Sequence, residues 1–333
     1  MERINWIDWA KVVAITMVVF GHIPENTDNF LLRYICTFHM PLFFFISGYL
    51  SKRQAVFPTN LRKYWQSLIV PYFLYNAIFY PYWIIRYTIE DESNLSVTNI
   101  VIKPLFGVLF GQIETQISSI LSGVTWFLIA LLMMRIMVDA CNQYKRSTLL
   151  MLLATLSLTA VYIASEYYHI MNNLLMKGFL RCVPFYVLGH LMRRWKCYSG
   201  TNFYLYTITA LILYAVSIIL YFMTNHPHSF GMHIIRVYSV PFTAIFAVLN
   251  TCKLLNSKTS QVLVNISSGT IMIMGLHWMI IGAINYTLQK LLTLGTEIRY
   301  EWYTALFLSV SIVTIIYPFI LLAQRRFPIL LGR

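Results

Sequence analysis

The stretch Trp6-Ile-Asp8-Trp-Ala-Lys11-Val-Val-Ala-Ile-Thr-Met-Val-Val-Phe-Gly-His22 decides the class of fold, because an apolar run near the start of the chain carries ionisable side chains within it. The next apolar run contains Phe38-His39-Met40-Pro41-Leu42-Phe43. Ionisable groups are costly to place in hydrocarbon, so those found there are candidates for chemistry. The two runs predict membrane helices that carry functional histidines.

The composition agrees with a membrane protein. Of 333 residues, 58% are hydrophobic and 11% are charged, whereas soluble domains have about 25% charged residues. Nearly every stretch belongs to an apolar segment, so residues 1–333 are expected to form one integral membrane domain. The excess of 25 Lys and Arg over 12 Asp and Glu does not indicate nucleic acid, because the basic residues are spread over short loops, as membrane topology requires.

The apolar segments predict an all-α polytopic fold with ten transmembrane helices, each long enough or nearly so to cross roughly 30 Å of hydrocarbon. The expected spans are 6–24, 31–50, 65–85, 122–140, 147–165, 176–192, 203–223, 235–251, 262–288 and 303–323. If Arg3 is cytoplasmic, alternation places roughly twice as many basic residues on the cytoplasmic side as on the other. Both termini are therefore expected in the cytoplasm, with the chain in the plasma (inner) membrane.

The long connection 86–121 is expected on the outer face. It begins with the acidic run Glu90-Asp91-Glu92-Ser93-Asn94 and continues with an apolar run that contains Lys103, Pro104 and Gly107. This apolar run is too short to span a bilayer, so we expect a re-entrant or interfacial segment. Such a segment either covers a site from outside or only packs against the helices.

Cysteine and loop histidine spacings indicate no metal site. The five cysteines, Cys36, Cys141, Cys182, Cys197 and Cys252, are scattered without paired spacing, so disulfides are not expected either. His226, His228 and His233 lie in a loop that contains Pro and Gly, and their spacing does not define a metal site.

Three histidines are expected at one depth. Counted from the cytoplasmic helix ends, His22 lies about 24 Å and His277 about 22 Å along their helices, and His39 lies about 12 Å in from the opposite end. Trp126 and Arg181 fall in the same layer. Imidazole suits general-base catalysis because its ordinary pKa is near neutrality. The alternative is that each ring is neutral and hydrogen-bonded to a neighbouring helix.

Asp8 and Lys11 are three residues apart on one helix face and are expected to pair. About 21 Å of helix separates Asp8 from His22, which excludes a direct dyad. The pair therefore belongs to the cytoplasmic end, where it either binds a ligand or neutralises a neighbouring helix.

Several motifs resemble those of one enzyme family, in order along nearly the whole chain. Arg3-(four)-Asp8-Trp-Ala-Lys11, Val18-Val-Phe-Gly-His22 and Phe38-His39-Met-Pro-Leu-Phe-Phe-Phe-Ile-Ser-Gly-Tyr49 resemble the opening of the acyltransferase family 3 integral membrane enzymes, and Asp-x-x-Lys resembles the fucose 4-O-acetylase-like branch. Trp126-Phe-Leu128, Pro184-Phe-Tyr-Val-Leu-Gly189 and Ser268-Gly-Thr-Ile-Met-Ile-Met-Gly-Leu-His277 are similar to later family segments.

The resemblance implies a ten-helix enzyme that takes an acyl group, usually acetyl, from cytoplasmic acyl-CoA to a hydroxyl of a saccharide or lipid-linked glycan at the other face. His22 matches the family's essential first-helix histidine. Where many members have an Arg-x-x-Arg pair, this chain has Arg62-Lys63 followed by Gln66-Ser67.

A mechanism follows as a hypothesis. The phosphates of acetyl-CoA contact basic cytoplasmic loops, which contain Lys52, Arg53, Arg62, Lys63, Arg193 and Arg194. The pantetheine arm brings the thioester to His22, which acts as general base or forms an acyl-imidazole. The oxyanion would be stabilised by His39, His277 or Arg181. The expected donor-binding residues are Asp8, Lys11, Arg62, Lys63, Trp126 and Arg181.

The sequence leaves two alternative functions open. A secondary transporter would also need intramembrane charges and broken helices, although the chain shows no two corresponding halves. An inactive relative that binds or flips a lipid-linked sugar is the other alternative. Membrane lipids are expected partners, and the sequence leaves open whether the chain forms a homodimer.

Overall fold

The computed structural model describes residues 3–25, 29–51, 58, 60–89, 97–196, 202–225, 229–293 and 298–333. Within these ranges the chain is almost entirely helical, and the one β-type pairing is an isolated bridge between Glu25 and Tyr300. The expectation of an all-α fold is confirmed.

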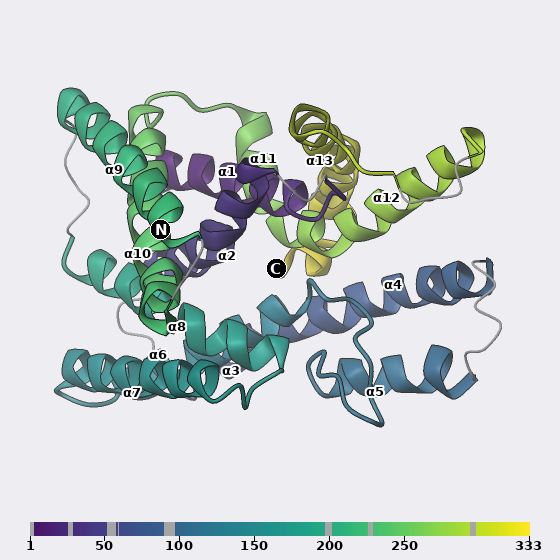
Figure 1. The fold of residues 1–333 in the computed structure, drawn as a ribbon, viewed down its shortest axis with the longest axis horizontal. Helices are drawn as coiled ribbons and strands as arrows, with labels where there is room; N and C mark the ends of the chain where they lie inside the picture. Colours follow the sequence, from purple (N-terminus) through teal and green to yellow (C-terminus); the bar gives the residue numbers. More distant parts are fainter. Residues whose placement is uncertain are drawn as a thin grey trace.

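The elements follow one another along the chain (Figure 1). They are α1 (Asn5–Phe20), α2 (Phe30–Leu50), α3 (Leu61–Tyr64), the π-helical turn η1 (Trp65–Ile69), α4 (Val70–Ile89), η2 (Thr98–Ile102), α5 (Lys103–Leu109), α6 (Trp126–Asn142), α7 (Ser147–Tyr167), α8 (Leu174–Arg194), α9 (Phe203–Thr224), α10 (Phe230–Leu254), α11 (Gln261–Ser268), α12 (Thr270–Leu291), α13 (Trp302–Arg326) and the 3-10 turn η3 (Pro328–Leu331).

Eight helical segments of the described chain are long and apolar enough to cross a membrane, the longest being the 28 residues Leu61–Thr88. The other two expected spans form shorter helices, α1 with 16 residues and α6 with 17. The chain is therefore a multi-pass membrane protein.

The first expected span, 6–24, ends earlier than predicted. The backbone N–H of His22 donates to Val19 O at 3.1 Å, which forms a turn directly after Phe20. Pro24 disfavours helical backbone at Ile23, and its carbonyl accepts a hydrogen bond from the backbone N–H of Tyr300 at 2.9 Å. The histidine expected inside the first helix thus lies in the turn that follows it.

The ninth expected span, 262–288, is two helices, α11 and α12, which meet at Gly269. A β-carbon at Gly269 would lie 2.4 Å from Cδ1 of Ile320, so α13 crosses close to this break. The break directs Ser267 and Ser268 toward one end of the bundle, where both line a cavity.

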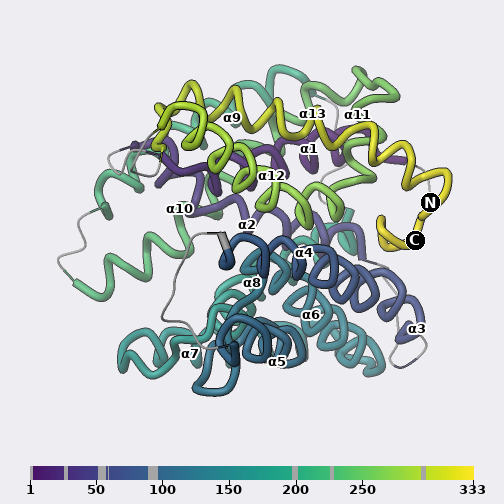
Figure 2. The backbone as a smooth tube through the Cα atoms, turned by 90° about the vertical axis from the view of Figure 1, so that its right-hand side faces the viewer, coloured from purple at the N-terminus to yellow at the C-terminus, as the bar shows by residue number. Residues whose placement is uncertain are grey.

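Helix α2 lies at the centre of the molecule (Figures 1 and 2). It packs against α8 on one side and against α1 and α10 on the other. A β-carbon at Gly48 would lie 2.0 Å from Tyr186 O, and one at Gly189 would lie 2.1 Å from Phe45 O. Small residues at such crossings let membrane helices pack backbone against backbone.

The connection expected to be re-entrant or interfacial forms the short helical segment η2–α5, which packs along α4. Tyr80 donates to Val101 O at 3.0 Å, and Trp83 donates to Ile100 O at 3.1 Å. Gln112, which is fully buried, then bonds Asn76 and the backbone N–H of Leu121, and so fixes the turn before Trp126. The segment η2–α5 and the turn after it therefore support the start of α6. The acidic run 90–94 lies outside the described residues.

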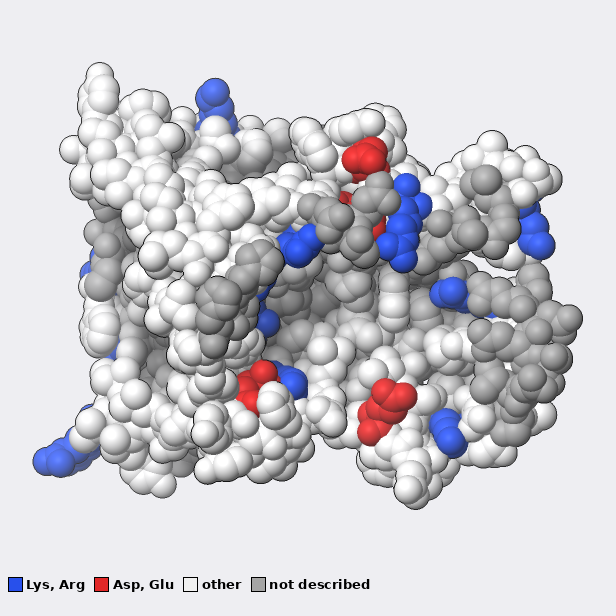
Figure 3. All heavy atoms as spheres, viewed as in Figure 1, with Lys and Arg blue, Asp and Glu red and all other residues white. Residues whose placement is uncertain are grey.

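The outer surface suits contact with lipid. In Figure 3 charged side chains are few and separated by large uncharged areas. The outward face of α9 exposes Tyr204, Leu211 and Phe222 to 78%, 66% and 59%. Cys36, Cys141, Cys182 and Cys252 are free thiols, and Cys197 lies outside the described residues.

Candidate active site

The three intramembrane histidines share one hydrogen-bonding pattern. Nδ1 of His22 lies 2.7 Å from Val18 O, Nδ1 of His39 lies 3.0 Å from Ile35 O, and Nδ1 of His277 lies 2.9 Å from Ile273 O. A carbonyl only accepts, so each Nδ1 carries the proton, and in the neutral ring Nε2 holds the lone pair. The pattern prepares Nε2 as the basic atom of each imidazole.

His22 and His277 are direct neighbours. Their ring centroids are 5.0 Å apart with an interplanar angle of 67°, and Trp278 lies 6.4 Å from His22. His277 is fully buried, and its Nε2 has no hydrogen-bond partner among the described residues. His277 does not line the cavity described next, so its expected contact with the oxyanion stays a prediction.

His22 and His39 line the same cavity of about 340 Å³, as does Trp126. The other lining residues are Ile15, Val18, Met40, Phe43, Gly123, Val124, Phe127, Leu174, Met274 and Trp278. We call this the central cavity. The sequence-based placement of two histidines and Trp126 in one layer is consistent with this arrangement, and His22 is the least buried of the three histidines.

Arg181 is not part of the central cavity. Its Nη2 donates to Thr37 O at 2.9 Å, and its Nε is buried without a partner in the described chain. The guanidinium therefore binds the backbone of α2 two residues before His39. This bond ties α8 to α2, and the expected roles of Arg181 in donor binding and at the oxyanion stay predictions.

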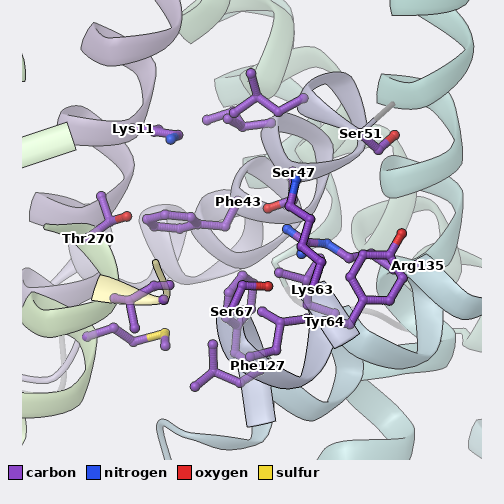
Figure 4. A pocket seen from close by; sticks show the side chains of 18 of the residues that line it. Lys11, Phe43, Ser47, Ser51, Lys63, Tyr64, Ser67, Phe127, Arg135 and Thr270 are labelled. Carbon is purple, nitrogen blue, oxygen red and sulfur yellow. The ribbon is translucent and has the colours of Figure 1, made fainter. Parts of the chain in front are cut away.

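An inner cavity of about 270 Å³ continues from the central one, since Ile15, Phe43, Phe127 and Met274 line both. Figure 4 shows Lys11 on one side of it and Lys63, Tyr64 and Arg135 on the other. Arg135 stands 5.4 Å from the centre of the Tyr64 ring, whose hydroxyl donates to Asp139 at 2.5 Å. The inner cavity is thus apolar toward His22 and cationic toward its other end.

A larger, basic cavity of about 600 Å³ follows and shares Lys11, Leu50 and Lys63 with the inner one. Its charged lining residues are Arg3, Asp8, Lys11, Lys63, Arg193 and Arg333. These come from helix ends that the topology prediction assigns to one side of the membrane. Five basic side chains and one acidic side chain give this cavity a positive charge that would attract an anion.

Asp8 does not serve mainly as the partner of Lys11. Its Oδ2 accepts from Nε of Arg3 at 2.6 Å, and its Oδ1 accepts a hydrogen bond from Ser267. Lys11 extends instead toward the inner cavity (Figure 4). The expectation of an Asp8–Lys11 pair is corrected to an Asp8–Arg3 ion pair, which leaves Lys11 facing a ligand space.

The two neighbouring basic residues of α3 differ in position. Lys63 lines both the inner and the basic cavities, whereas Arg62 is exposed and lines neither. Lys52 and Arg53 lie outside the described residues. Only Lys63 of the expected pair is therefore placed to contact a ligand in these cavities.

An outer cavity of about 410 Å³ lies on the opposite side of His22, between α4 and α12. It shares His22 and Trp278 with the central cavity. Its remaining lining combines the aromatic and polar residues Phe79, Tyr82, Trp83, Arg86, Asn285, Tyr286, Thr287 and Gln289 with the aliphatic or small residues Pro24, Ile85, Ile281, Gly282 and Ala283. The four cavities thus form a series from a basic end to an aromatic end, with His22 at the junction between the central and outer cavities.

Sequence reasoning missed several of these residues. Arg135 is a lone cation in the apolar run of α6, four residues before Asp139, and this intramembrane position was a usable signal. Arg333 follows the last helix without any periodic pattern, and the sequence held no signal for it. Of the three loop histidines, Nε2 of His233 lies 3.6 Å from a carboxylate oxygen of Glu166, and His226 and His228 lie outside the described residues.

Comparison with known proteins gives one match. The acyltransferase domain of the acyltransferase 3 family matches residues 4–323. No curated protein and no solved structure matches the chain. The matched range includes α1 with its Asp8, His22, the central cavity and nearly all of the spanning helices, so the chain belongs to acyltransferase family 3.

Proposed function

We propose that this membrane acyltransferase is an O-acyltransferase, most directly an O-acetyltransferase of the fucose 4-O-acetylase-like branch. It moves an acyl group from cytoplasmic acyl-CoA to a saccharide hydroxyl on the other side of the inner membrane. The observation that carries the proposal is the series of connected cavities, with cations at one end, aromatic and amide side chains at the other and His22 between them.

The donor binds from the basic end. Coenzyme A carries several phosphate charges, and phosphates form strong charge-assisted hydrogen bonds with Arg and Lys. Lys63, Arg193 and Arg333 line the basic cavity, whose single acidic side chain, Asp8, is paired with Arg3. The uncharged arm of the donor then passes Phe43 and Phe127, which line both the inner and central cavities.

His22 acts as the general base through Nε2. This atom takes the proton of the acceptor hydroxyl while the hydroxyl oxygen attacks the thioester carbonyl. The new C–O bond forms, the C–S bond breaks, and the imidazolium returns the proton to the departing thiolate. The reaction yields an ester and free CoA without any further reactant.

For stabilisation of the oxyanion we propose a different group from the expected His39, His277 and Arg181. With Nδ1–H bonded to the backbone, neutral His39 offers only an acceptor at Nε2. Among the described residues that line the central cavity, the side-chain donors are the indole N–H groups of Trp126 and Trp278. We therefore assign oxyanion stabilisation to an indole, with Trp126 the candidate expected in this layer.

The acceptor binds in the outer cavity. Aromatic rings there can stack on the C–H faces of a sugar, while Asn285, Thr287 and Gln289 offer hydrogen-bonding groups. Arg86 adds a positive charge at the same end. This chemistry fits a saccharide, free or lipid-linked, whose hydroxyl reaches inward to His22.

A secondary transporter is the second candidate, because a series of cavities with polar groups at both ends also suits a solute path. Acetyl-CoA supplied to purified protein separates the two functions. An acyltransferase releases CoA when a saccharide acceptor is added, and the release depends on His22. A transporter, or a protein that only binds or flips lipid-linked sugar, releases none.

A further inference from the structure

The segment that follows α13 folds back into the molecule. After Arg326 the chain turns through η3 and reaches Gly332 and Arg333, beside α4, α12 and η1. In Figure 2 the C-terminal end of the chain lies below α13, on the side of α3 and α4. Residues far apart in sequence therefore meet beside the donor cavities.

Specific contacts hold this segment in place. The buried Tyr75 hydroxyl donates to Leu330 O at 2.6 Å, and the Leu331 side chain is only 4% exposed. The backbone N–H of Gly332 donates to Ile329 O at 3.1 Å, and that of Arg333 donates to Pro328 O at 3.2 Å. These contacts hold the segment against the bundle.

Gly332 determines where Arg333 points. Its φ of +70° lies in the left-handed region, which favours glycine. A β-carbon there would lie 2.7 Å from Ser67 O, in the π-helical turn η1. Only glycine allows this close approach, which seats the chain against η1 and carries it from the inner cavity, lined by Gly332, to the basic cavity, lined by Arg333.

We propose that Arg333 is a donor-specificity residue, which binds the phosphorylated nucleotide end of the acyl donor, while Gly332 lines the donor path. The proposal rests on the proposed function. Arg333 lines the basic cavity together with Lys63 and Arg193, and the one acidic side chain there, Asp8, is paired with Arg3. A guanidinium at this mouth pairs with phosphate in bidentate geometry.

Binding of adenosine 3′,5′-bisphosphate to the purified full-length protein tests the site without catalysis. Arg333→Gln should weaken binding roughly tenfold, the loss expected for one charge-assisted hydrogen bond. Arg333→Lys should recover part of it. Arg326→Gln is the matched control, because Arg326 is an exposed cation at the end of α13 outside these cavities, and it should bind as the wild type does. Equal affinity in wild type and Arg333→Gln overturns the proposal.

Acetyl transfer provides the second readout. With acetyl-CoA as donor, Arg333→Gln should raise KM about tenfold and leave kcat nearly unchanged. With acetyl-pantetheine, which lacks the nucleotide, wild type and variant should have the same KM. A rise with both donors would indicate a merely structural role and contradict the specificity claim. If the wild type transfers from neither donor, the proposed function fails, while the nucleotide-binding result still decides whether Arg333 forms an anion site.

Discussion

The imidazole of His22 lies against that of His277, with ring centroids 5.0 Å apart, and the two rings differ sharply in access. His22 borders two cavities, whereas His277 is fully buried. Both use Nδ1–H to bond the carbonyl four residues earlier, so both present a basic Nε2. His22 therefore borders the ligand spaces, and His277 packs against the His22 ring from within the protein.

Replacing His277 by Gln should therefore slow the chemical step without weakening donor binding. The buried ring touches His22 but does not line the central cavity, so we expect kcat to fall roughly tenfold to a hundredfold with KM for acetyl-CoA nearly unchanged. Steady-state kinetics of the purified variant measure both constants. His233→Gln, on the outer part of α10, is the control and should keep full activity. A changed KM with an unchanged kcat would place His277 on the donor path instead.

The carboxyl of Glu25 should make stability depend on pH. Burial, opposed by the hydrogen bond from Asn29 and reinforced by the charge of Glu301, raises the pKa of Glu25 to about 7. Because the folded state holds this proton more tightly than the unfolded state, stability should be greatest in acid and fall as pH rises from the unfolded pKa toward 7.

The substitution Glu25→Gln isolates this effect. The variant should match the wild type near pH 5 and have a higher Tm than the wild type at pH 8, since the neutral amide cannot ionise. Thermal unfolding across this pH range in one detergent measures the difference. A Tm difference that does not grow with pH would show that Glu25 keeps an ordinary pKa.

The crossing of α2 and α8 should not tolerate a side chain at Gly48. A methyl group there would lie 2.0 Å from Tyr186 O, so Gly48→Ala must push the helices apart. Overpacking of this kind costs about 1–3 kcal/mol. Gly231→Ala is the matched control: its β-carbon would meet only Ser229 Oγ at 3.9 Å, so the lower backbone entropy of the unfolded chain should stabilise by about 0.5–1 kcal/mol. Opposite signs of ΔTm are expected, and equal shifts would contradict the close crossing.

Tyr82 should contribute to acceptor binding. Its ring lines the outer cavity over Gly282, where a sugar would enter. Tyr82→Ala should raise the acceptor KM about tenfold and leave the acetyl-CoA KM unchanged, because the donor enters from the other end. Tyr204→Ala, on the lipid-exposed face of α9, should change neither constant. A higher KM for acetyl-CoA in the Tyr82 variant would contradict the proposal that the outer cavity binds the acceptor and not the donor.

The sequence predicted the helices well because hydropathy over about twenty residues is a strong signal. All ten expected segments have a helical counterpart. Counting residues along the helices predicted His22, His39 and Trp126 at a similar depth, and all three line one cavity. These results depend only on helix rise and on the cost of burying polar groups.

Side-chain direction could not be predicted in the same way. Lys63 faces the cavities and Arg62 does not, and this choice depends on how α3 and η1 pack against the rest of the bundle. The bond from Arg181 to Thr37 O and the ion pair of Asp8 with Arg3 likewise depend on contacts between separate segments or on the path of the chain before α1. No periodicity encodes such contacts.

CoA release by purified His22→Gln protein, compared with wild type in the presence of acetyl-CoA and a saccharide acceptor, tests most directly whether His22 is the base. A general base contributes about 10²–10⁴-fold, so the variant should lose at least about a hundredfold in kcat while it still binds acetyl-CoA from the basic end. A His22→Gln protein that binds acetyl-CoA and transfers its acetyl group at the wild-type rate would contradict the central claim that His22 Nε2 is the base.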